Sequence, residues 1–298
     1  MTMNNLFWEK ELLKRITSGT MLVLLLLSML TLTLHIQVGE ASGTIYIRGD
    51  GSIDPPTAPI STVDNVTYTF TDNINDSIVV ERNDIIINGT NHTLQGVDNG
   101  TGIDLSGRLN VTVKNIEIKS FTQGVYLNES SNNLIIENDI TNNQYGIYLE
   151  NSSGNTVFHN NFKNNTQQVF IYTLGNANVW DDGYPSGGNY WSDYNGTDFY
   201  SGLYQNETGS DGIGDTPYVM DANNTDRYPL IYPYGFVPCP DVNGDGTVNI
   251  LDAIRASIAF GSYPSHLRWN YSVDQNKDST INIFDIIIIA RNFGKTYP

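Results

Sequence analysis

NNLIIENDITNNQYGIYLENSS, residues 132–153, is followed directly by GNTVFHNNFKNNTQQVFIYTLG, residues 154–175. The two segments align position by position when Asn132 is placed above Gly154, so this part of the chain is an internal repeat. The aligned pairs are Asn133 with Asn155, Asn138 with Asn160, Ile140 with Phe162, Asn142 with Asn164, and Ile147 with Val169. A repeat of fixed period is typical of a chain that stacks similar structural units.

Each unit contains three short apolar or alternating runs, separated by clusters of Asn, Gly and Ser. Runs of this length favour strands, and the polar clusters favour turns. A unit with three short strands cannot bury its apolar face alone, but it can when successive units coil and stack. The sequence therefore predicts an all-β solenoid, a right-handed parallel β-helix, with about five to six coils between residues 60 and 175.

The recurrent Asn residues predict ladders inside the turns, in which each buried amide bonds to the amide of the next coil. An earlier unit, Asn110–Asn115, aligns with Asn133–Asn138 by its residue types. In this alignment Asn110 shares the phase of Asn133, and the sequon that it begins is expected to be buried. Other Asn-X-Ser/Thr sequons along the chain are candidates for glycosylation.

The chain has 298 residues and a net charge of −17, so its surface is strongly acidic. Binding to nucleic acid is excluded on this ground, because it requires basic patches that contact phosphates. Residues 1–41 are predicted to be a signal peptide, since basic residues precede the apolar run Met21–Leu34. The protein is then secreted or exposed at the cell surface, and it contacts a membrane only if this segment is not cleaved. The single cysteine, Cys239, excludes an intrachain disulfide.

Three segments resemble those of archaeal NosD-like β-helix proteins. They are GTIYIRGDGSIDPPTAPI from Gly43, GNYWSDYNGTD from Gly188 and DGIGDTPYVMD from Asp211. The resemblance spans residues 43–235, and its family label covers carbohydrate-associated modules and periplasmic copper-binding proteins. We expect the coils of the β-helix over residues 43–175 and an aromatic, Gly-rich cap over residues 176–236.

The side chains of the predicted β-helix do not favour copper binding or hydrolysis. Copper prefers imidazole and soft sulfur ligands, and these are scattered without paired spacing. Hydrolysis of a glycosidic bond needs two carboxylates that flank it, and no two acidic residues of the coils recur at one phase as a plausible pair. The residues considered are His92, His159, His266, Met220 and Cys239 for copper, and Asp84, Asp104, Glu117, Glu137, Asp139 and Glu150 for hydrolysis.

A cluster of aromatic and acidic residues after the coils allows three interpretations, which are sugar binding, a cap on the last coil and catalysis by its carboxylates. Ring faces and carboxylates suit a sugar, which stacks on the rings while its hydroxyls bond to the polar tips. A solenoid also has to cover its last open coil, and large aromatic residues do this well. The cluster consists of Trp180, Asp181, Asp182, Tyr190, Trp191, Asp193 and Tyr194.

Near the C-terminus, DVNGDGTVNILD from Asp241 and DQNKDSTINIFD from Asp274 are two copies of one loop. Side-chain oxygens recur at positions 1, 3, 5, 9 and 12, and a backbone carbonyl is available at position 7, which is the ligand spacing of a calcium loop. Two Ca²⁺ ions are therefore predicted. Their predicted ligands are Asp241, Asn243, Asp245, Thr247, Asn249 and Asp252 in one loop, and Asp274, Asn276, Asp278, Thr280, Asn282 and Asp285 in the other. Position 6 needs a sharp turn, which Gly246 suits, whereas Ser279 departs from this pattern.

A helical run follows each loop, and the two units over residues 237–298 resemble a type I dockerin. The resemblance implies a small α domain that docks onto a cohesin module of another protein. The partner-contacting residues implied by it are Ile250, Leu251, Ile283 and Phe284. The leading prediction is an exported, carbohydrate-associated β-helix that attaches to a cohesin-bearing scaffold and contributes to polysaccharide binding or breakdown. A glycoside hydrolase or polysaccharide lyase, and a non-catalytic structural surface protein, are the alternatives.

Overall fold

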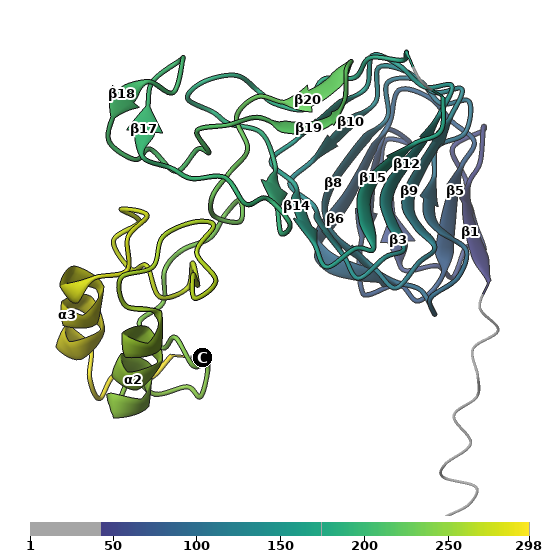
Figure 1. Ribbon diagram of the computed structural model, residues 1–298. Helices are drawn as coiled ribbons and strands as arrows, with labels where there is room; N and C mark the ends of the chain where they lie inside the picture. Colours follow the sequence, from purple (N-terminus) through teal and green to yellow (C-terminus); the bar gives the residue numbers. More distant parts are fainter. Residues whose placement is uncertain (1–42, 174, 298) are drawn as a thin grey trace, which may run out of the picture. The chain divides into compact units, whose positions relative to one another are not determined.

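The computed structural model describes residues 43–173 and 175–297, so the predicted signal peptide lies outside the described residues. Two long sheets of mostly parallel strands dominate the first part of the described chain, and two short helices follow them (Figure 1). By their contacts, residues Thr44–Pro298 form one unit. Among the described residues, we find no helix with the length and apolar character needed to cross a membrane.

Sheet A has the strand order β15-β12-β9-β7-β5-β1-β2. Its strands are β1 (Thr44–Ile47), β2 (Ile53–Asp54), β5 (Ser77–Val80), β7 (Thr101–Asp104), β9 (Gln123–Asn128), β12 (Tyr145–Glu150) and β15 (Gln167–Ile171). All neighbours pair in parallel except β1 and β2. The antiparallel β2 covers the edge of the first coil, so that this edge does not stay open for another strand.

Sheet B has the order β16-β14-β11-β8-β6-β4-β3, and two further strands, β10 and β13, extend it beside β8. Its strands are β3 (Ile60–Ser61), β4 (Thr67–Phe70), β6 (Ile86–Gln95), β8 (Thr112–Lys119), β10 (Leu134–Ile136), β11 (Asp139–Thr141), β13 (Thr156–Phe158), β14 (Asn161–Lys163) and β16 (Tyr190–Trp191). The long β8 pairs with both β10 and β11, because a turn splits the later coils into two strands at this place.

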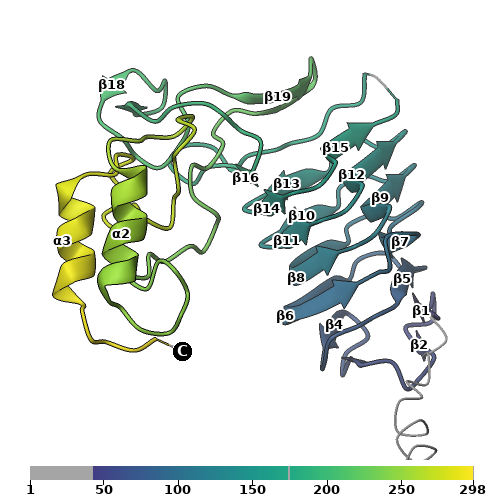
Figure 2. The same ribbon diagram turned by 60° about the horizontal axis from the view of Figure 1, so that its bottom comes forward.

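The last two full coils confirm the predicted repeat. Leu134 lies beside Thr156, and Asp139 lies beside Asn161, which are the partners that the alignment of the two quoted segments predicts. Figure 2 shows the strands of successive coils as the rungs of a stack. The predicted all-β solenoid with parallel strands is therefore confirmed.

The predicted alignment of Asn110 with Asn133, and with it the burial of Asn110, is wrong. Leu134 pairs with Thr112, which places Asn133 beside Val111 instead. Asn110 is exposed and has a left-handed backbone with φ of 56°, and its amide donates to Asp84 at 2.8 Å. Its sequon is consequently accessible at a turn.

Columns of apolar side chains fill the space between the two sheets. Alternate residues of each strand point inward, and equivalent residues of successive coils stack on one another. Two such columns in sheet B are Ile87, Val113, Ile135 and Val157, and Leu94, Ile118, Ile140 and Phe162, all of them buried. Burying each of these side chains stabilises the fold by roughly 1.5–3 kcal/mol before entropy is counted.

Buried Asn side chains connect the coils at three turns, as the recurrent Asn residues predict. In one ladder, Asn138 Oδ1 accepts the N–H of Ile116 at 3.1 Å, and Asn138 Nδ2 donates to Asn160 Oδ1 at 2.9 Å. The ladders are Asn133–Asn155–Asn178, Asn138–Asn160–Asn189 and Asn143–Asn165. Each amide thus satisfies a backbone N–H that would otherwise be buried without a partner.

The segment after the coils forms the cap, which contains β17 (Tyr200–Ser201), β18 (Glu207–Thr208), β19 (Tyr218–Asp221) and β20 (Asn224–Asp226). Two ladders end on β20. Asn224 Oδ1 accepts the N–H of Asn178 at 3.1 Å, and Asp226 Oδ2 accepts the N–H of Asn189 at 2.7 Å. Burial raises the pKa of Asp226 to about 7.

The two C-terminal repeats have their own small hydrophobic core. The helices are α2 (Ile250–Ala259) and α3 (Ile283–Arg291). Each begins with a capping box, in which Asn249 or Asn282 caps the helix and an acidic residue three positions later bonds back. The core consists of Val242, Val248, Ala256, Ala259, Val273, Ile281 and Ile289.

Candidate functional site

The two tryptophans predicted as sugar contacts lie inside the cap. Trp180 and Trp191 are each 1% exposed, and their Nε1 atoms donate to Asn224 Oδ1 at 3.1 Å and to Asp226 Oδ2 at 2.8 Å. Trp191 is also stacked between Phe162, at 4.4 Å, and Tyr218, at 4.3 Å. This placement leaves no face of either indole free for a sugar ring, and both rings close the end of the hydrophobic core.

The other five residues of this cluster do not form one site. Asp181 is buried and forms an ion pair with Arg227 at 2.6 Å. Burial raises the pKa of Asp181, but the hydrogen bonds from Arg227 outweigh this effect and hold the pKa below its ordinary value. The remaining partners are Ser186 for Asp182, Tyr218 for Asp193, Thr216 for Tyr194 and the ring of Tyr271 for Tyr190.

A groove on the outer face of sheet B gathers polar side chains that sequence reasoning did not combine. Glu117 pairs with Asp139, and Asp139 pairs with Asn161, so the three lie on adjacent strands at one phase. The expectation that no two acidic residues share a phase as a plausible pair is therefore wrong. Glu117 and Asp139 are separated by one repeat unit, so the period of the repeat alone was enough to align them.

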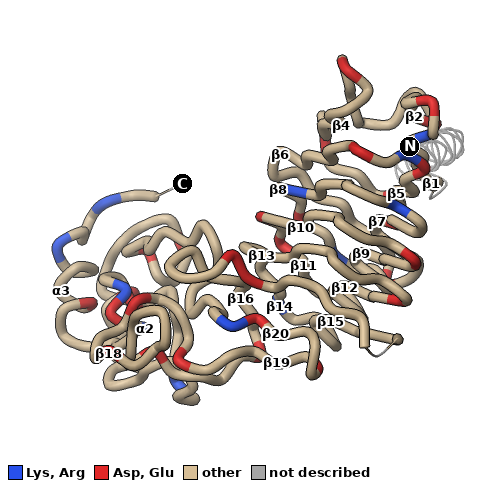
Figure 3. The backbone as a smooth tube through the Cα atoms, turned by 90° about the horizontal axis from the view of Figure 1, so that it is seen from above, with Lys and Arg blue, Asp and Glu red and all other residues tan. Residues whose placement is uncertain are grey.

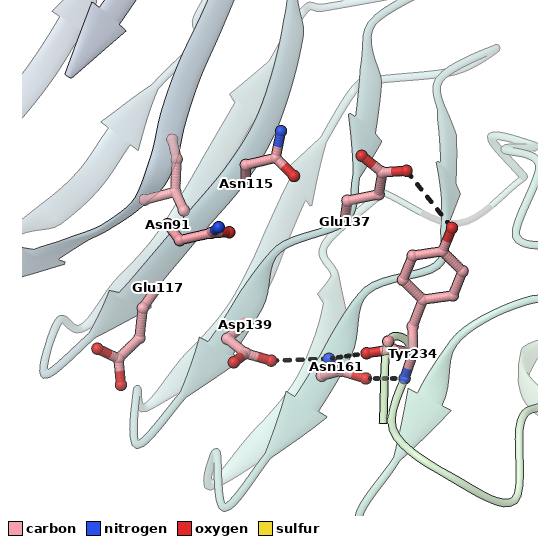
Figure 4. Close-up of a pocket in the computed structure, with 9 residues that line it drawn as sticks. Asn91, Asn115, Glu117, Glu137, Asp139, Asn161 and Tyr234 are labelled. Carbon is pink, nitrogen blue, oxygen red and sulfur yellow. Dashed lines mark hydrogen bonds between the residues drawn. The ribbon is translucent and has the colours of Figure 1, made fainter. Parts of the chain in front are cut away.

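Tyr234 forms one wall of this groove, which we call the sheet-B groove (Figure 4). Its backbone N–H donates to Asn161 Oδ1 at 2.6 Å, and its hydroxyl reaches Glu137 Oε1 at 3.4 Å. One face of its ring stacks on His159 at 4.1 Å. The groove has a volume of about 270 Å³ and is lined by Asn91, Asn115, Ile116, Glu117, Glu137, Asp139, Asn161, Tyr234 and Gly235.

Lysines on the same strands balance two carboxylates of the groove. Lys119 lies 2.9 Å from Glu117, and Lys163 lies 3.0 Å from Asp139. Burial raises the pKa of Glu117, but hydrogen bonds from Thr93 and Lys119 outweigh it and hold the pKa below its usual value. A general acid for glycoside hydrolysis needs a raised pKa, so Glu117 is suited to accept hydrogen bonds from a ligand rather than to donate a proton.

The two acidic loops have the same conformation. Gly244 and Gly246 of the first loop have left-handed backbones, and so do Lys277 and Ser279 at the equivalent positions of the second loop. Their side-chain contacts also agree. The equivalent hydrogen bonds are Asn243 to Asp245 and Asn276 to Asp278, Thr247 N–H to Asp245 and Thr280 N–H to Asp278, and Asn249 N–H to Asp252 and Asn282 N–H to Asp285.

The carboxylates of these loops have no basic partner within residues 43–173 and 175–297. Asp252, Asp274 and Asp285 are nonetheless fully buried. Burial, together with neighbouring carboxylates, raises the pKa of Asp274 to about 6 and also raises that of Asp285. Buried carboxylates without a counter-charge are costly, and a cation with oxygen ligands relieves this cost.

The side-chain oxygens of the loops mostly accept backbone N–H groups. Asp241, for example, accepts from Gly244 and Gly246 at 2.9 and 2.8 Å. In the described part of the chain, no three His, Cys, Asp or Glu side chains converge tightly enough to hold a metal. The type and number of the oxygen donors fit calcium, whereas their present contacts would have to be exchanged for contacts with the ion.

The second loop is bonded to the cap. Tyr232 donates its hydroxyl to Asp274 Oδ2 at 2.7 Å, and Ser279 donates its hydroxyl to Asp198 Oδ2 at 2.7 Å. The tyrosine hydroxyl also accepts the N–H of Ser279 at 3.2 Å. All four residues are buried, and burial raises the pKa of Asp198 to about 6. The departure from Gly at Ser279 thus has a structural reason, because its hydroxyl connects the loop to the cap.

The residues predicted to contact a partner are exposed on the two helices. Ile250 and Leu251 are 61% and 53% exposed, and Ile283 and Phe284 are 52% and 62% exposed. Each pair lies in the first turn of its helix, directly after an Asn cap. The duplicated apolar pairs are therefore available to another molecule.

The histidines of the described chain do not converge on one point at which a metal ion could bind. The ring of His92 contacts the carbonyl of Gly89, His159 stacks on Tyr234, and His266 accepts the N–H of Arg268. These contacts occupy separate elements, so the donor set does not fit a copper site built on imidazoles.

Comparison with known proteins identifies a family for the solenoid. Residues 42–196, more than half of the 298-residue chain, match the family described as periplasmic copper-binding protein (NosD). No curated protein and no solved structure matches the chain. The match ends within the cap and does not include the two loop–helix repeats. The chain belongs to the NosD family, a periplasmic family whose solenoid it builds from parallel β-coils.

Proposed function

We propose that this protein is an exported, non-catalytic component that holds a polysaccharide in the sheet-B groove. The observation that carries this proposal is the column of Glu117, Asp139 and Asn161 beside the partly exposed ring of Tyr234. Carboxylate and amide oxygens accept hydrogen bonds from sugar hydroxyls, and an aromatic side chain offers an apolar surface to the ring of a sugar. An exported NosD-family protein meets such polymers outside the cytoplasm.

A glycoside hydrolase or polysaccharide lyase is the second candidate. Glu117 and Asp139 favour it, because they lie on adjacent strands, and neighbouring strands are about 4.7–4.9 Å apart. Both carboxylates, however, are bonded to lysines, and the lowered pKa of Glu117 is opposite to that of a general acid. We therefore favour binding over cleavage. A purely structural surface protein, decorated with glycans at sequons such as Asn110, is the third candidate.

Incubation of the full chain with insoluble polysaccharides tests these candidates. We expect retention on at least one glycan without release of reducing or unsaturated ends. The double variant Glu117→Gln/Asp139→Asn should reduce this retention, whereas Glu129→Gln, an exposed carboxylate outside the groove lining, should not. Release of ends that the double variant abolishes would establish an enzyme. Equal retention of all variants on the glycan would show that the sheet-B groove does not bind the polysaccharide.

We further propose that the two acidic loops bind Ca²⁺ and that the C-terminal repeats form a dockerin. The ligands would be Asp241, Asn243, Asp245, the carbonyl of Thr247, Asn249 and Asp252, with the equivalent residues Asp274, Asn276, Asp278, Thr280, Asn282 and Asp285 in the second loop. Asn249 and Asn282 also cap the helices, so an ion at these positions would hold each helix against its loop. The unpaired buried carboxylates support this proposal.

The proposed partner is a cohesin module, which would bind the exposed pairs Ile250/Leu251 and Ile283/Phe284. Immobilised cohesin modules of several types, with and without a calcium chelator, test the proposal. We expect calcium-dependent capture that is lost in the variant Leu251→Ser/Phe284→Ser but retained in Leu267→Ser, which changes a fully exposed residue outside the two helices. Capture that does not depend on calcium, or that is retained in the variant Leu251→Ser/Phe284→Ser, would contradict the dockerin proposal.

A further inference from the structure

The outer face of sheet A carries aromatic side chains on three successive strands. Tyr126 of β9, Tyr148 of β12 and Phe170 of β15 lie at one phase, each beside the next. Tyr145 of β12 joins them, with its ring 5.5 Å from that of Tyr148 and 5.0 Å from that of Phe170. We call these four residues the aromatic strip. In Figure 1 these three strands face the viewer, and no described segment crosses in front of them.

The aromatic strip points outward because the alternate residues of the same strands fill the core. Val125, Ile147 and Val169 are buried between the sheets, so the residues that follow them in sequence must face solvent. All four rings are partly exposed. Ring centroids separated by 5.5 Å between Tyr126 and Tyr148, and by 4.8 Å between Tyr148 and Phe170, make a continuous apolar surface along the solenoid.

A cleft continues the strip at the end of the sheet. Phe170 belongs to both the strip and this cleft, which has a volume of about 360 Å³ and lies between β15 and β19. Two carboxylates, Asp193 and Asp221, line it together with Tyr218 and Gln167. The strip therefore leads from an aromatic surface into a pocket with hydrogen-bond acceptors. Asp193 is the one member of the predicted sugar cluster that lies here.

The charge of this face restricts its ligand. The strands β7, β9, β12 and β15 contain two acidic residues, Asp104 and Glu150, and no Lys or Arg. Figure 3 shows how few basic residues the described chain contains. Tyr126 donates its hydroxyl to Glu150 at 2.9 Å, which fixes this carboxylate at the edge of the strip. Anionic polymers are repelled by such a surface, whereas neutral or amino-bearing sugars are not.

We propose that the outer face of sheet A is a second glycan-binding surface, which holds a polysaccharide without acidic groups across the aromatic strip and its end in the adjoining cleft. Sugar rings stack their C–H faces on aromatic rings, and their hydroxyls donate to the carboxylates beside them. Amino groups would gain attraction from both the carboxylates and the ring faces. This surface shares no residue with the sheet-B groove, so each of the two proposals can fail without the other.

Binding of the full chain to three soluble polymers tests this inference: a neutral glucan, a glucosamine polymer and a polyuronate. We expect binding to the first two and none to the polyuronate. The variant Tyr126→Thr/Tyr148→Thr keeps β-branched strand formers but removes two rings, and it should weaken glucan binding by about tenfold or more. Tyr46→Thr is the matched control, because Tyr46 has the same phase on β1 but is separated from the strip by Val79 and Asp104.

The same aromatic contacts also stabilise the sheet, so binding has to be distinguished from folding. Tyr126→Phe/Tyr148→Phe keeps both rings and should bind glucan as the unaltered chain does. Saturation transfer from aromatic protons to the bound sugar, recorded on the unaltered chain, needs no variant. Binding of the polyuronate alone, binding of no polymer, or unchanged glucan binding by the threonine variant would overturn the proposal. Self-association that the threonine variant abolishes would assign the face to a second copy and would also overturn it.

Discussion

Removal of one rung from an Asn ladder should cost more stability than any nearby surface change. Asn143 Oδ1 accepts the N–H of Phe121 at 3.0 Å, and its Nδ2 donates to the carbonyl of Ile118 and to Asn165 Oδ1, each at 3.0 Å. In the variant Asn143→Ala the buried N–H of Phe121 loses its acceptor, which costs about 1–3 kcal/mol. With about 0.5–1.5 kcal/mol for each of the two lost donor contacts, the free energy of unfolding should fall by about 2–6 kcal/mol.

Chemical denaturation followed by the fluorescence of the buried cap tryptophans measures this loss. At about 2–4 °C per kcal/mol for a domain of this length, a change of this size lowers the melting temperature by about 4–24 °C. Gln144→Ala is the control, since Gln144 is the exposed neighbour of Asn143 and bonds to the previous coil through its backbone. It should change stability by less than about 0.5 kcal/mol. Equal effects of the two substitutions would refute the view that amide ladders hold the coils together.

Three further predictions concern the cap and the second loop. The pKa of Asp226 is raised to about 7 in the folded chain, so the contribution of this residue to stability is full below about pH 4 and is lost as the pH rises towards 7. The variant Asp226→Asn should therefore flatten this part of the pH profile of the unfolding free energy. An unchanged profile would contradict the raised pKa of Asp226. Gly188→Ala should destabilise the cap strongly, because a Cβ there would overlap the carboxylate of Asp226, and a melting curve checks it. Tyr232→Phe removes the hydroxyl that bonds to Asp274 and Ser279, and calorimetric titration with calcium should show one of two binding steps weakened about three- to tenfold, an effect of about 1 kcal/mol.

The repeat region of the fold was predictable because its contacts join residues that are one repeat period apart in the sequence. Strands, turns and ladder residues recur at one fixed period, so the partner of Asn138 is found by counting to Asn160. The count fails nearer the N-terminus. Ile86 pairs with Thr112 and His92 with Ile116, two separations that differ from each other and exceed the period, with a register shift between them. Turns of different length change the separation there. At Asn110 the period still holds, because Leu109 pairs with Ser131 and Thr112 with Leu134, and Asn110 was placed one position out of phase because its segment was aligned by residue type instead of by the period.

The ends of the ladders and the groove wall were not predictable from the period. Asn224 lies 46 residues beyond Asn178, and Tyr234 lies 73 residues beyond Asn161, so neither contact repeats. The sequence showed that the cap is rich in aromatic residues, but not which of their rings point into the core and which face solvent. Only the fold distinguishes the indoles turned into the core from the tyrosines on the outer face of sheet A.

The ladders that end on β20 have a consequence for the length of the molecule. The cap recognises only the last rung, through Asn224 and Asp226, and every preceding rung offers the same acceptor geometry to the one before it. Insertion or deletion of one whole repeat unit would leave the contacts at both ends unchanged. The number of coils can therefore change by whole repeat units, in evolution or by engineering. Each added unit lengthens the outer faces of both sheets and requires no change at either end.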